Sequence, residues 1–164
     1  MQNLEIINRK VLEITDLKRR LSLWKFFDKK IVFTNGCFDI VHLGHLDYLS
    51  KAKNLGDILL IGLNTDESVK QIKGSHRPVT DQNARAIFLA SLKFVDGVIF
   101  FSETTPYNLI KEIKPDVLVK GSDYQIKEIV GADIVEENGG QIITLDFLEG
   151  YSTTSIIKKI KEIP

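Results

Sequence analysis

Five short runs rich in Val, Ile, Leu and Phe alternate with helical stretches from Lys30 onward, and no other feature of the sequence constrains the fold as strongly. The runs lack strict polar alternation, which is typical of strands covered on both faces. Because strands that alternate with helices are joined by right-handed crossovers, the pattern predicts a parallel sheet. The expected strands cover residues 30–36, 57–64, 95–101, 115–121 and 140–146. We therefore predict an α/β fold: a single doubly wound, Rossmann-like domain whose five-stranded parallel sheet is flanked by helices.

Helical patterns fill the intervals between these runs. Gly56 is a stop signal for the first helix, Asp81 is a candidate N-cap for the second, Pro106 suits the first turn of the third, and Ser152 is a candidate N-cap for the last. The expected helices cover residues 45–56, 81–92, 105–114, 126–138 and 152 to the C-terminus.

The chain has 164 residues, which is enough for one core and too few for two full domains. Residues from about 13 to 28 carry the pattern of an amphipathic helix, and residues 1–29 are expected to form a helical flank packed on a domain of residues 30–164. The aromatic residues Trp24, Phe26 and Phe27 of this flank could form the interface of a homo-oligomer as easily as they could cover the core. Any second catalytic unit is expected on another polypeptide.

The 22 Lys and Arg residues balance 22 Asp and Glu residues, so the formal net charge is zero. This balance removes long-range attraction as a reason to expect nucleic acid or an anionic membrane as a partner. A single Cys cannot form an intramolecular disulfide, and the N-terminal MQNLEIINRK lacks the apolar run of a signal peptide. The sequence therefore predicts a cytoplasmic protein.

Unusual residues follow three of the predicted strands. The segments are TNGCFDIVHLGH after the first strand, KGSDY after the fourth and LEGYSTT after the fifth. In doubly wound sheets, ligands bind beyond the carboxyl ends of the strands, where the strand order reverses. The functional site is expected there.

His42 and His45 lie at the start of the helix that follows the first strand. A spacing of three residues places both imidazoles on one face of the first turn. Unpaired backbone N–H groups and the helix dipole favour a phosphate at that position, and Gly44 lets a ligand approach the main chain. Two imidazole donors beside a helix N-terminus suit the charge that builds on an α-phosphate during in-line displacement.

Two other interpretations of the pair stay open. The two histidines with Asp39 are a possible zinc site, for which His76 and Cys37 are the remaining nitrogen and thiol candidates. The second interpretation is a structural role for either imidazole. The order strand, Gly-containing loop and helix favours phosphate over both.

Seven linked motifs resemble the HxGH nucleotidyltransferase superfamily, and more closely the D-glycero-β-D-manno-heptose 1-phosphate adenylyltransferase family. The resemblance runs from about Lys30 to Ile160. Class I aminoacyl-tRNA synthetases carry a related motif, but this short chain has no KMSKS-like segment. The motifs are TNGCFD at 34–39, HLGH at 42–45, LGD at 55–57, LNTD at 63–66, KGSHRP at 73–78, VLVKGSDY at 117–124 and EGYSTT at 149–154.

The resemblance implies a set of nucleotide-binding residues around catalytic His42 and His45, which would steady the transition state at the α-phosphate of ATP. The hydroxyls and amides at the start of the last helix would hold the β- and γ-phosphates, as the capping pattern also suggests; an ordinary N-cap is the alternative. The implied nucleotide-binding residues are Asn35, Gly36, Cys37, Phe38, Gly44, Arg85, Lys120, Gly121, Asp123, Ser152, Thr153 and Thr154.

The acceptor side is expected near the second strand and the KGSHRP loop, where Lys73 and Arg77 could close over a sugar phosphate. Asp39 and Asp66 at strand ends could orient the acceptor or approach Mg²⁺ indirectly, while capping is an equal alternative. The expected acceptor-binding residues are Asp39, Asn64, Asp66, Lys73 and Arg77. Ser122, Tyr151 and the pair Asn83-Ala84 depart from the family pattern, while the HLGH motif itself is intact.

The resemblance implies transfer of AMP from ATP to heptose 1-phosphate, giving ADP-heptose and pyrophosphate for lipopolysaccharide synthesis. Mg²⁺ would be held mainly by the triphosphate, with no direct protein ligand. Cys37 is expected to fill space, since direct transfer needs no covalent intermediate. A separate heptose kinase is expected in the same pathway. The alternatives are a glycerol-3-phosphate cytidylyltransferase or another small phosphate-ester nucleotidyltransferase, and, outside catalysis, a silent nucleotide-binding module that regulates a partner.

Overall fold

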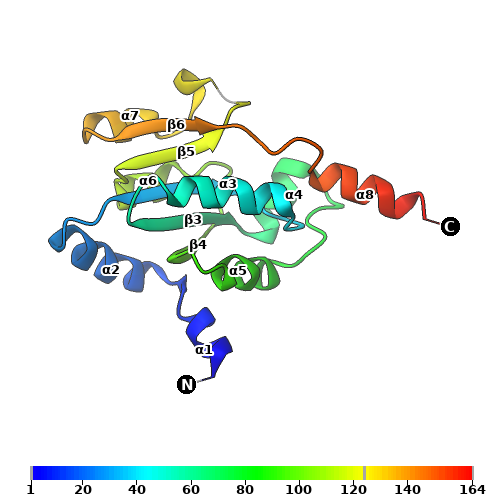
Figure 1. The fold of residues 1–164 in the computed structure, drawn as a ribbon, viewed down its shortest axis with the longest axis horizontal. Coiled ribbons are helices and arrows are strands. Elements are labelled where there is room, and N and C mark those ends of the chain that lie inside the picture. Colours follow the sequence, from blue (N-terminus) through cyan, green and yellow to red (C-terminus); the bar gives the residue numbers. More distant parts are fainter. Residues whose placement is uncertain (1, 124, 164) are drawn as a thin grey trace.

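The computed structural model describes residues 2–123 and 125–163, so Tyr124 of the KGSDY segment lies outside the described residues. Its centre is one parallel sheet with the strand order β1-β4-β3-β2-β5-β6 (Figure 1). The strands are β1 (Val11–Leu12), β2 (Ile31–Gly36), β3 (Ile58–Asn64), β4 (Gly97–Phe101), β5 (Val117–Gly121) and β6 (Gln141–Leu145).

The doubly wound α/β fold is confirmed, and the sheet has one strand more than the five predicted. The additional strand, β1, pairs with β4 through Val11 and Leu12, so the N-terminal flank is not wholly helical. Two residues are too few to show a period, which is why the pattern of the sequence does not reveal this strand.

The helices cover both faces of the sheet. They are α1 (Asn3–Asn8), α2 (Ile14–Phe26), α3 (Leu43–Lys53), α4 (Asp66–Lys73), α5 (Gln82–Ser91), α6 (Tyr107–Ile113), α7 (Ala132–Glu137) and α8 (Thr153–Lys161), with a 3₁₀ turn η1 (Ile126–Glu128). None of the described helices is long and apolar enough to cross a membrane.

Two helices differ from the pattern of the sequence. The helix expected over residues 126–138 is broken into η1 and α7, because Gly131 between them has a left-handed conformation with φ of 85°. Helix α4 was not expected. Its N-cap Thr65 accepts a hydrogen bond from the Ser68 amide at 3.3 Å. The helix has 8 residues, which is too short a run for the sequence pattern to predict it.

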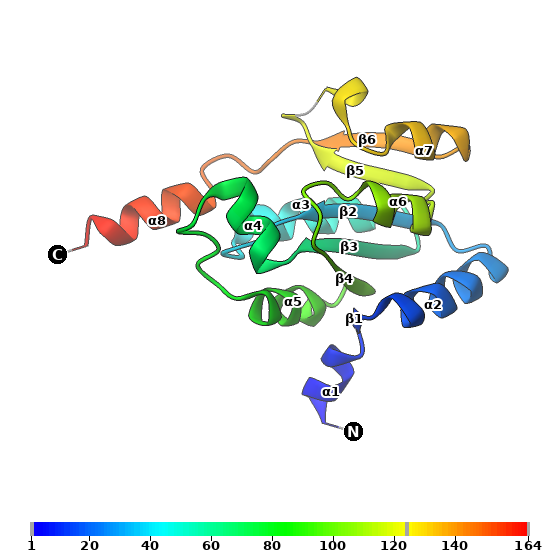
Figure 2. The same cartoon turned by 180° about the vertical axis from the view of Figure 1, so that it is seen from behind.

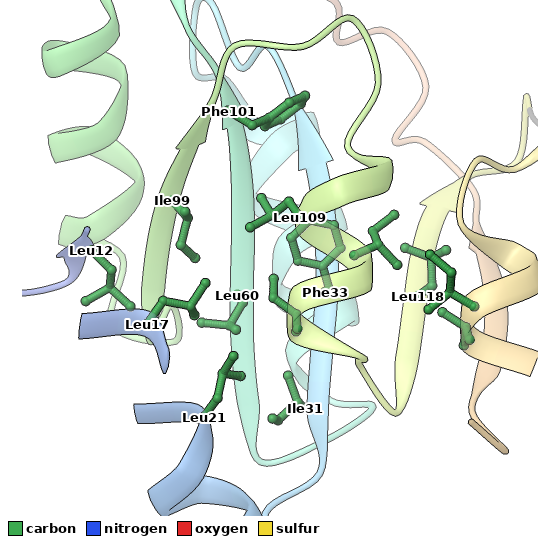
Figure 3. Packing of buried hydrophobic residues seen from close by; sticks show 14 of the residues in the cluster. Leu12, Leu17, Leu21, Ile31, Phe33, Leu60, Ile99, Phe101, Leu109 and Leu118 are labelled. Carbon is green, nitrogen blue, oxygen red and sulfur yellow. The ribbon is translucent and has the colours of Figure 1, made fainter. Parts of the chain in front are cut away.

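Alternate residues of the central strands feed two separate cores, as expected for strands buried on both faces. Phe33 and Leu60 pack with α2, α6 and α7 on one face (Figure 3), whereas Val32 and Ile61 pack with α3 and α5 on the other. Helix α8 buries no residue and extends from the body at the end opposite the N-terminus (Figure 2).

The strand order reverses beside β2, which pairs with β3 on one side and with β5 on the other. The chain runs outward from β2 through β3 to β4, and then crosses back to β5 and β6. The carboxyl ends of β2 and β5 therefore form the switch point, where such sheets bind ligands.

Candidate active site

A cavity of about 520 Å³ lies at the carboxyl ends of the strands. Its walls come from segments that follow all four central strands and from the start of α8. It therefore brings together residues that are more than 100 positions apart in the sequence. The residues expected from the sequence that line it are Asn35, Gly36, Cys37, Phe38, Asp39, His45, Asn64, Lys73, Arg77, Lys120, Gly121, Asp123, Thr153 and Thr154.

The two histidines of HLGH form a stacked pair at the start of α3. His42 is the N-cap residue, with an extended backbone, and its carbonyl accepts the amide of His45 at 2.9 Å. The ring centroids are 3.8 Å apart and the planes differ by 21°. His45 lines the cavity, while His42 stacks on it outside the lining, with a buried Nδ1 that has no hydrogen-bond partner among the described residues. The pair thus presents one imidazole to a ligand and supports it with the other.

Burial keeps both imidazoles neutral at neutral pH. It lowers the pKa of His45 to about 4, with a further decrease from the neighbouring His42 and a small opposing effect of the Ile40 carbonyl. It also lowers the pKa of His42. A neutral imidazole still carries one N–H donor, and a bound anion would favour its protonated form. The pair can therefore respond to a phosphate.

Gly44 is confined by protein atoms. A Cβ on this residue would lie 3.1 Å from the His42 ring and 3.1 Å from the Cβ of Tyr151. The segment before α8 therefore passes directly over the first turn of α3. This contact joins the HLGH turn to the STT segment.

The start of α8 forms one side of the cavity. Ser152 is its N-cap and accepts the Ser155 amide at 3.0 Å, so the predicted capping role of Ser152 is confirmed. Thr153 and Thr154 line the cavity, whereas Ser152 does not. The two threonines, with the backbone amides of the first turn, supply donors suited to phosphate oxygens.

Asp39 holds the KGSHRP loop against the end of β2. Its buried carboxylate accepts Arg77 Nε at 2.5 Å and the amides of Val79 and Thr80 at 2.7 and 2.9 Å. Both carboxylate oxygens are therefore engaged in holding this loop, and Asp39 is not the N-cap of a described helix. Arg77 is fixed at the cavity wall, near the exposed Lys73 at the end of α4.

The structure gives Arg85 a different place from the one expected. Its side chain is fully buried and does not line the cavity. The guanidinium donates to the carbonyls of Thr80, Cys37 and Asn64 at 3.0, 2.5 and 2.9 Å and to Asp66 Oδ1 at 2.8 Å. Arg85 therefore ties three segments of the cavity wall together. The predicted direct contact with the nucleotide is replaced by a positioning role, because the side chain is buried outside the cavity. Asp66, its ion-pair partner, also lies outside the lining.

Asn64 begins a buried polar chain across the acceptor side. Its Nδ2 donates to Ser68 Oγ at 2.9 Å, and Ser68 Oγ donates to the Glu103 carbonyl at 2.9 Å. Asn64 and Ser68 are 3% and 0% exposed. The chain fixes the segment after β4 to α4.

Lys120 is the buried cation of the other side. Its Nζ donates to Asn35 Oδ1, and burial lowers its pKa to about 8 against an opposing effect of Asp123. The ammonium is therefore mostly charged at neutral pH. Cys37 lies on the opposite side, with its Sγ 4.0 Å from Asn64 Oδ1. Burial raises the pKa of its thiol, so the thiol is protonated at neutral pH as a space-filling residue would be.

Nine lining residues were not expected from motifs. Most follow the ends of β4, β5 or β6, so the rule that ligands bind at the carboxyl ends of the strands is the signal that could have found them. Tyr48 lies one turn after His45, its hydroxyl is 2.8 Å from Thr34 Oγ1, and its ring stacks on Phe147 with centroids 5.9 Å apart. The nine are Tyr48, Ile72, Thr104, Thr105, Pro106, Glu128, Ile129, Val130 and Phe147.

Sequence comparisons match most of the chain. The profile of the cytidylyltransferase-like family covers residues 33–159. The chain is 59% identical over 134 residues to the bifunctional protein HldE of Campylobacter concisus, and 55% identical over 150 residues to the bifunctional protein HldE of Campylobacter jejuni subsp. doylei. These matches cover 82% and 92% of this chain but 28% and 32% of the relatives, so the chain spans about a third of their length.

Two solved structures resemble the fold. The lipopolysaccharide core biosynthesis protein from Thermoplasma volcanium GSS1 aligns with a TM-score of 0.59 and 30% identity, over 76% of this chain and 99% of that one. A pantoate-beta-alanine ligase from Francisella tularensis, complexed with beta-gamma ATP and beta-alanine, aligns with a TM-score of 0.55 and 20% identity, over 90% of this chain and 76% of that one. The second likeness concerns the fold alone.

Proposed function

This chain belongs to the cytidylyltransferase-like family and is a nucleotidyltransferase, and from that premise we propose that it transfers AMP from ATP to D-glycero-β-D-manno-heptose 1-phosphate. The products are ADP-heptose and pyrophosphate. One observation carries the proposal: a single cavity joins His45 of the stacked pair to cations from both sides of the switch point, Lys73, Arg77 and Lys120. Two substrates that both carry phosphate need such a cavity.

The choice of sugar rests on the ordered motifs and on the relatives. The resemblance to heptose 1-phosphate adenylyltransferases extends from the HLGH turn to the STT segment. The identity of 55–59% to proteins named HldE supports the same choice, as does the likeness to a lipopolysaccharide core biosynthesis protein. The acceptor is a sugar 1-phosphate, and a heptose kinase remains the expected source of it.

The reaction is a direct in-line displacement. An anionic oxygen of the sugar phosphate attacks the α-phosphorus of ATP, the new P–O bond forms, and the bond to the bridging oxygen breaks as pyrophosphate leaves. The attacking oxygen is already ionised near neutral pH, so no general base is required. Rate enhancement must come from positioning and charge stabilisation.

The residues divide these tasks. His45 would donate a hydrogen bond to the α-phosphate as charge builds there, and His42 would hold the His45 ring by stacking. Thr153, Thr154 and Lys120 would hold the triphosphate. Lys73 and Arg77 would bind the phosphate of the acceptor. Arg85 would position the cavity wall without touching either substrate.

Mg²⁺ is part of the proposal as the partner of the triphosphate, whose charge it would neutralise. Within residues 2–123 and 125–163, no group of three or more His, Cys, Asp or Glu is arranged to hold a metal. Asp39 and Asp66 are in ion pairs with Arg77 and Arg85. We propose that phosphate oxygens supply most of the ligands of the ion.

The proposal is tested by pyrophosphate release from ATP or CTP, each with heptose 1-phosphate or glycerol 3-phosphate and Mg²⁺. We expect the highest rate with ATP and heptose 1-phosphate, and its loss when Mg²⁺ is removed by a chelator. A preference for CTP and glycerol 3-phosphate would replace the proposed substrates with those of a cytidylyltransferase. Nucleotide binding without turnover on any acceptor would instead indicate a regulatory module.

A further inference from the structure

The lining of the cavity differs between the two sides of β2. The side that follows β5 and β6 contributes the apolar side chains of Ile129, Val130 and Phe147, beside the charged Lys120, Asp123 and Glu128. A flat aromatic base gains most from apolar contacts of this kind. The nucleoside therefore suits this side.

The side that follows β3 and β4 contributes two cations and two hydroxyls, from Lys73, Arg77, Thr104 and Thr105. The cations suit a phosphate. The rest of a sugar phosphate carries hydroxyl groups. Threonine hydroxyls suit these groups, because they both donate and accept hydrogen bonds. Thr104 and Thr105 are exposed at the cavity wall, and the mechanism above assigns them no task.

The segment that carries these threonines is fixed at both ends. Before them, the Glu103 carbonyl accepts the buried Ser68 hydroxyl at 2.9 Å, and Asn108 Nδ2 donates to the Glu103 carboxylate at 3.3 Å. After them, Pro106 is buried and its carbonyl accepts the amide of Ile110 at 2.9 Å. A platform that is held in this way can select a ligand, because its hydroxyls need not be ordered on binding.

We propose that Thr104 and Thr105 determine acceptor specificity by hydrogen-bonding the sugar hydroxyls of the acceptor, while Lys73 and Arg77 hold its phosphate. This inference rests on the proposed function and extends it to the sugar. The ligand class is a polyhydroxylated sugar phosphate. A site that hydrogen-bonds ligand hydroxyls discriminates strongly against analogues that lack them.

The test is the double variant Thr104→Val and Thr105→Val, which keeps the side-chain shape and removes both hydroxyls. We expect kcat/KM for heptose 1-phosphate to fall about tenfold or more, with KM for ATP changed less than about twofold. The rate with glycerol 3-phosphate, which has fewer hydroxyls, should fall much less. The double variant Thr104→Ser and Thr105→Ser keeps the hydroxyls and should retain the wild-type preference, and Thr15→Val on α2 is the matched control outside the cavity.

Two results would overturn the inference while leaving the proposed function intact. One is an unchanged ratio of the two acceptors in the valine variant. The other is an equal loss for both acceptors and for ATP, which would show a structural role of the segment. A wild-type protein that transfers AMP to no sugar phosphate would overturn the proposed function itself, and with it this inference, and it is recognised before any variant is made.

Discussion

The two edges of the sheet use polar groups in opposite ways. At the amino edge, Asp57, Asp96 and Asp116 each come just before a strand, and each accepts the backbone amide of a residue at the start of a neighbouring strand, at 2.7 to 2.9 Å. Each carboxylate therefore fastens one strand to the next. At the carboxyl edge, the His45 imidazole, ammonium groups and hydroxyls instead line a cavity.

Stability and activity should therefore depend on different edges of the sheet. Carboxylates that are satisfied by backbone amides contribute to the folded state and have little capacity left for a ligand. Groups that line the cavity without such bonds contribute little to folding and are available for binding, whereas Asp39 both lines the cavity and accepts two backbone amides. Changes at the amino edge should therefore lower stability alone, and changes at the carboxyl edge should lower activity alone.

Arg85 is an exception to this separation of stability from activity, and its replacement should have the largest effect. It lies at the carboxyl edge, but its guanidinium is fully buried and satisfied by three carbonyls and Asp66. Truncation leaves these acceptors and a carboxylate without their partner. Arg85→Ala should lower the free energy of unfolding by about 3–5 kcal/mol, as measured by urea denaturation.

The control is Arg19→Ala, which removes an arginine that is likewise paired with an aspartate, at 3.1 Å, but is 72% exposed. This change should cost less than about 1 kcal/mol. Equal stability of the two variants would show that Arg85 does not join the segments of the cavity wall. Arg85→Lys keeps the charge without the planar fork and should recover only part of the loss.

His45 lies at the carboxyl edge, so its replacement should lower activity and leave stability nearly unchanged. His45→Ala removes a donor placed at the α-phosphate, so kcat should fall about 10²- to 10³-fold, which is the cost of removing one such donor. The urea midpoint measured at pH 8, where the imidazole is neutral, should shift little. His76→Ala is the matched control, because this histidine is exposed and does not line the cavity. Full pyrophosphate release by His45→Ala would remove the imidazole from the mechanism.

The sequence predicts the sheet and its helices better than it predicts the contacts between distant segments. The five apolar runs predict the parallel sheet, and HLGH predicts the place of the site. Two residues of β1 show no period. A helical arginine such as Arg85 has the same pattern whether it faces water or three carbonyls, because its partners come from distant segments. Thr104 and Thr105 belong to no motif, and only the strand order brings them to the cavity.

The next largest effect should be the dependence of the free energy of unfolding on pH below pH 7. The pKa of His45 falls from 6.5 to about 4 on folding, so between these values the unfolded chain binds a proton that the folded chain does not. The free energy of unfolding should therefore decrease as pH falls from about 7 to 4, by at most about 3 kcal/mol from this group. Below about pH 4 both states are protonated and its effect levels off.

Comparison with His45→Gln isolates this contribution, because all other titrating groups are shared. Urea unfolding of both proteins from pH 8 to pH 4 should give a stability difference that moves in favour of the variant as the pH falls. A difference that is constant over this range would show that the imidazole titrates alike in the folded and unfolded chains.

The smallest expected effect tests the amino edge. Asp96 accepts the buried Leu59 amide at 2.7 Å and Lys53 Nζ at 2.6 Å. Asp96→Ala leaves that amide unsatisfied and should cost about 1–3 kcal/mol in urea unfolding. Asp96→Asn keeps an acceptor for the amide and should cost less. Since Asp96 is separated from the cavity by the length of the strands, kcat and both KM values of the folded variants should equal those of the wild type. A loss of turnover in folded Asp96→Ala would mean that the two edges are coupled through the sheet, and the separation of stability from activity would then fail.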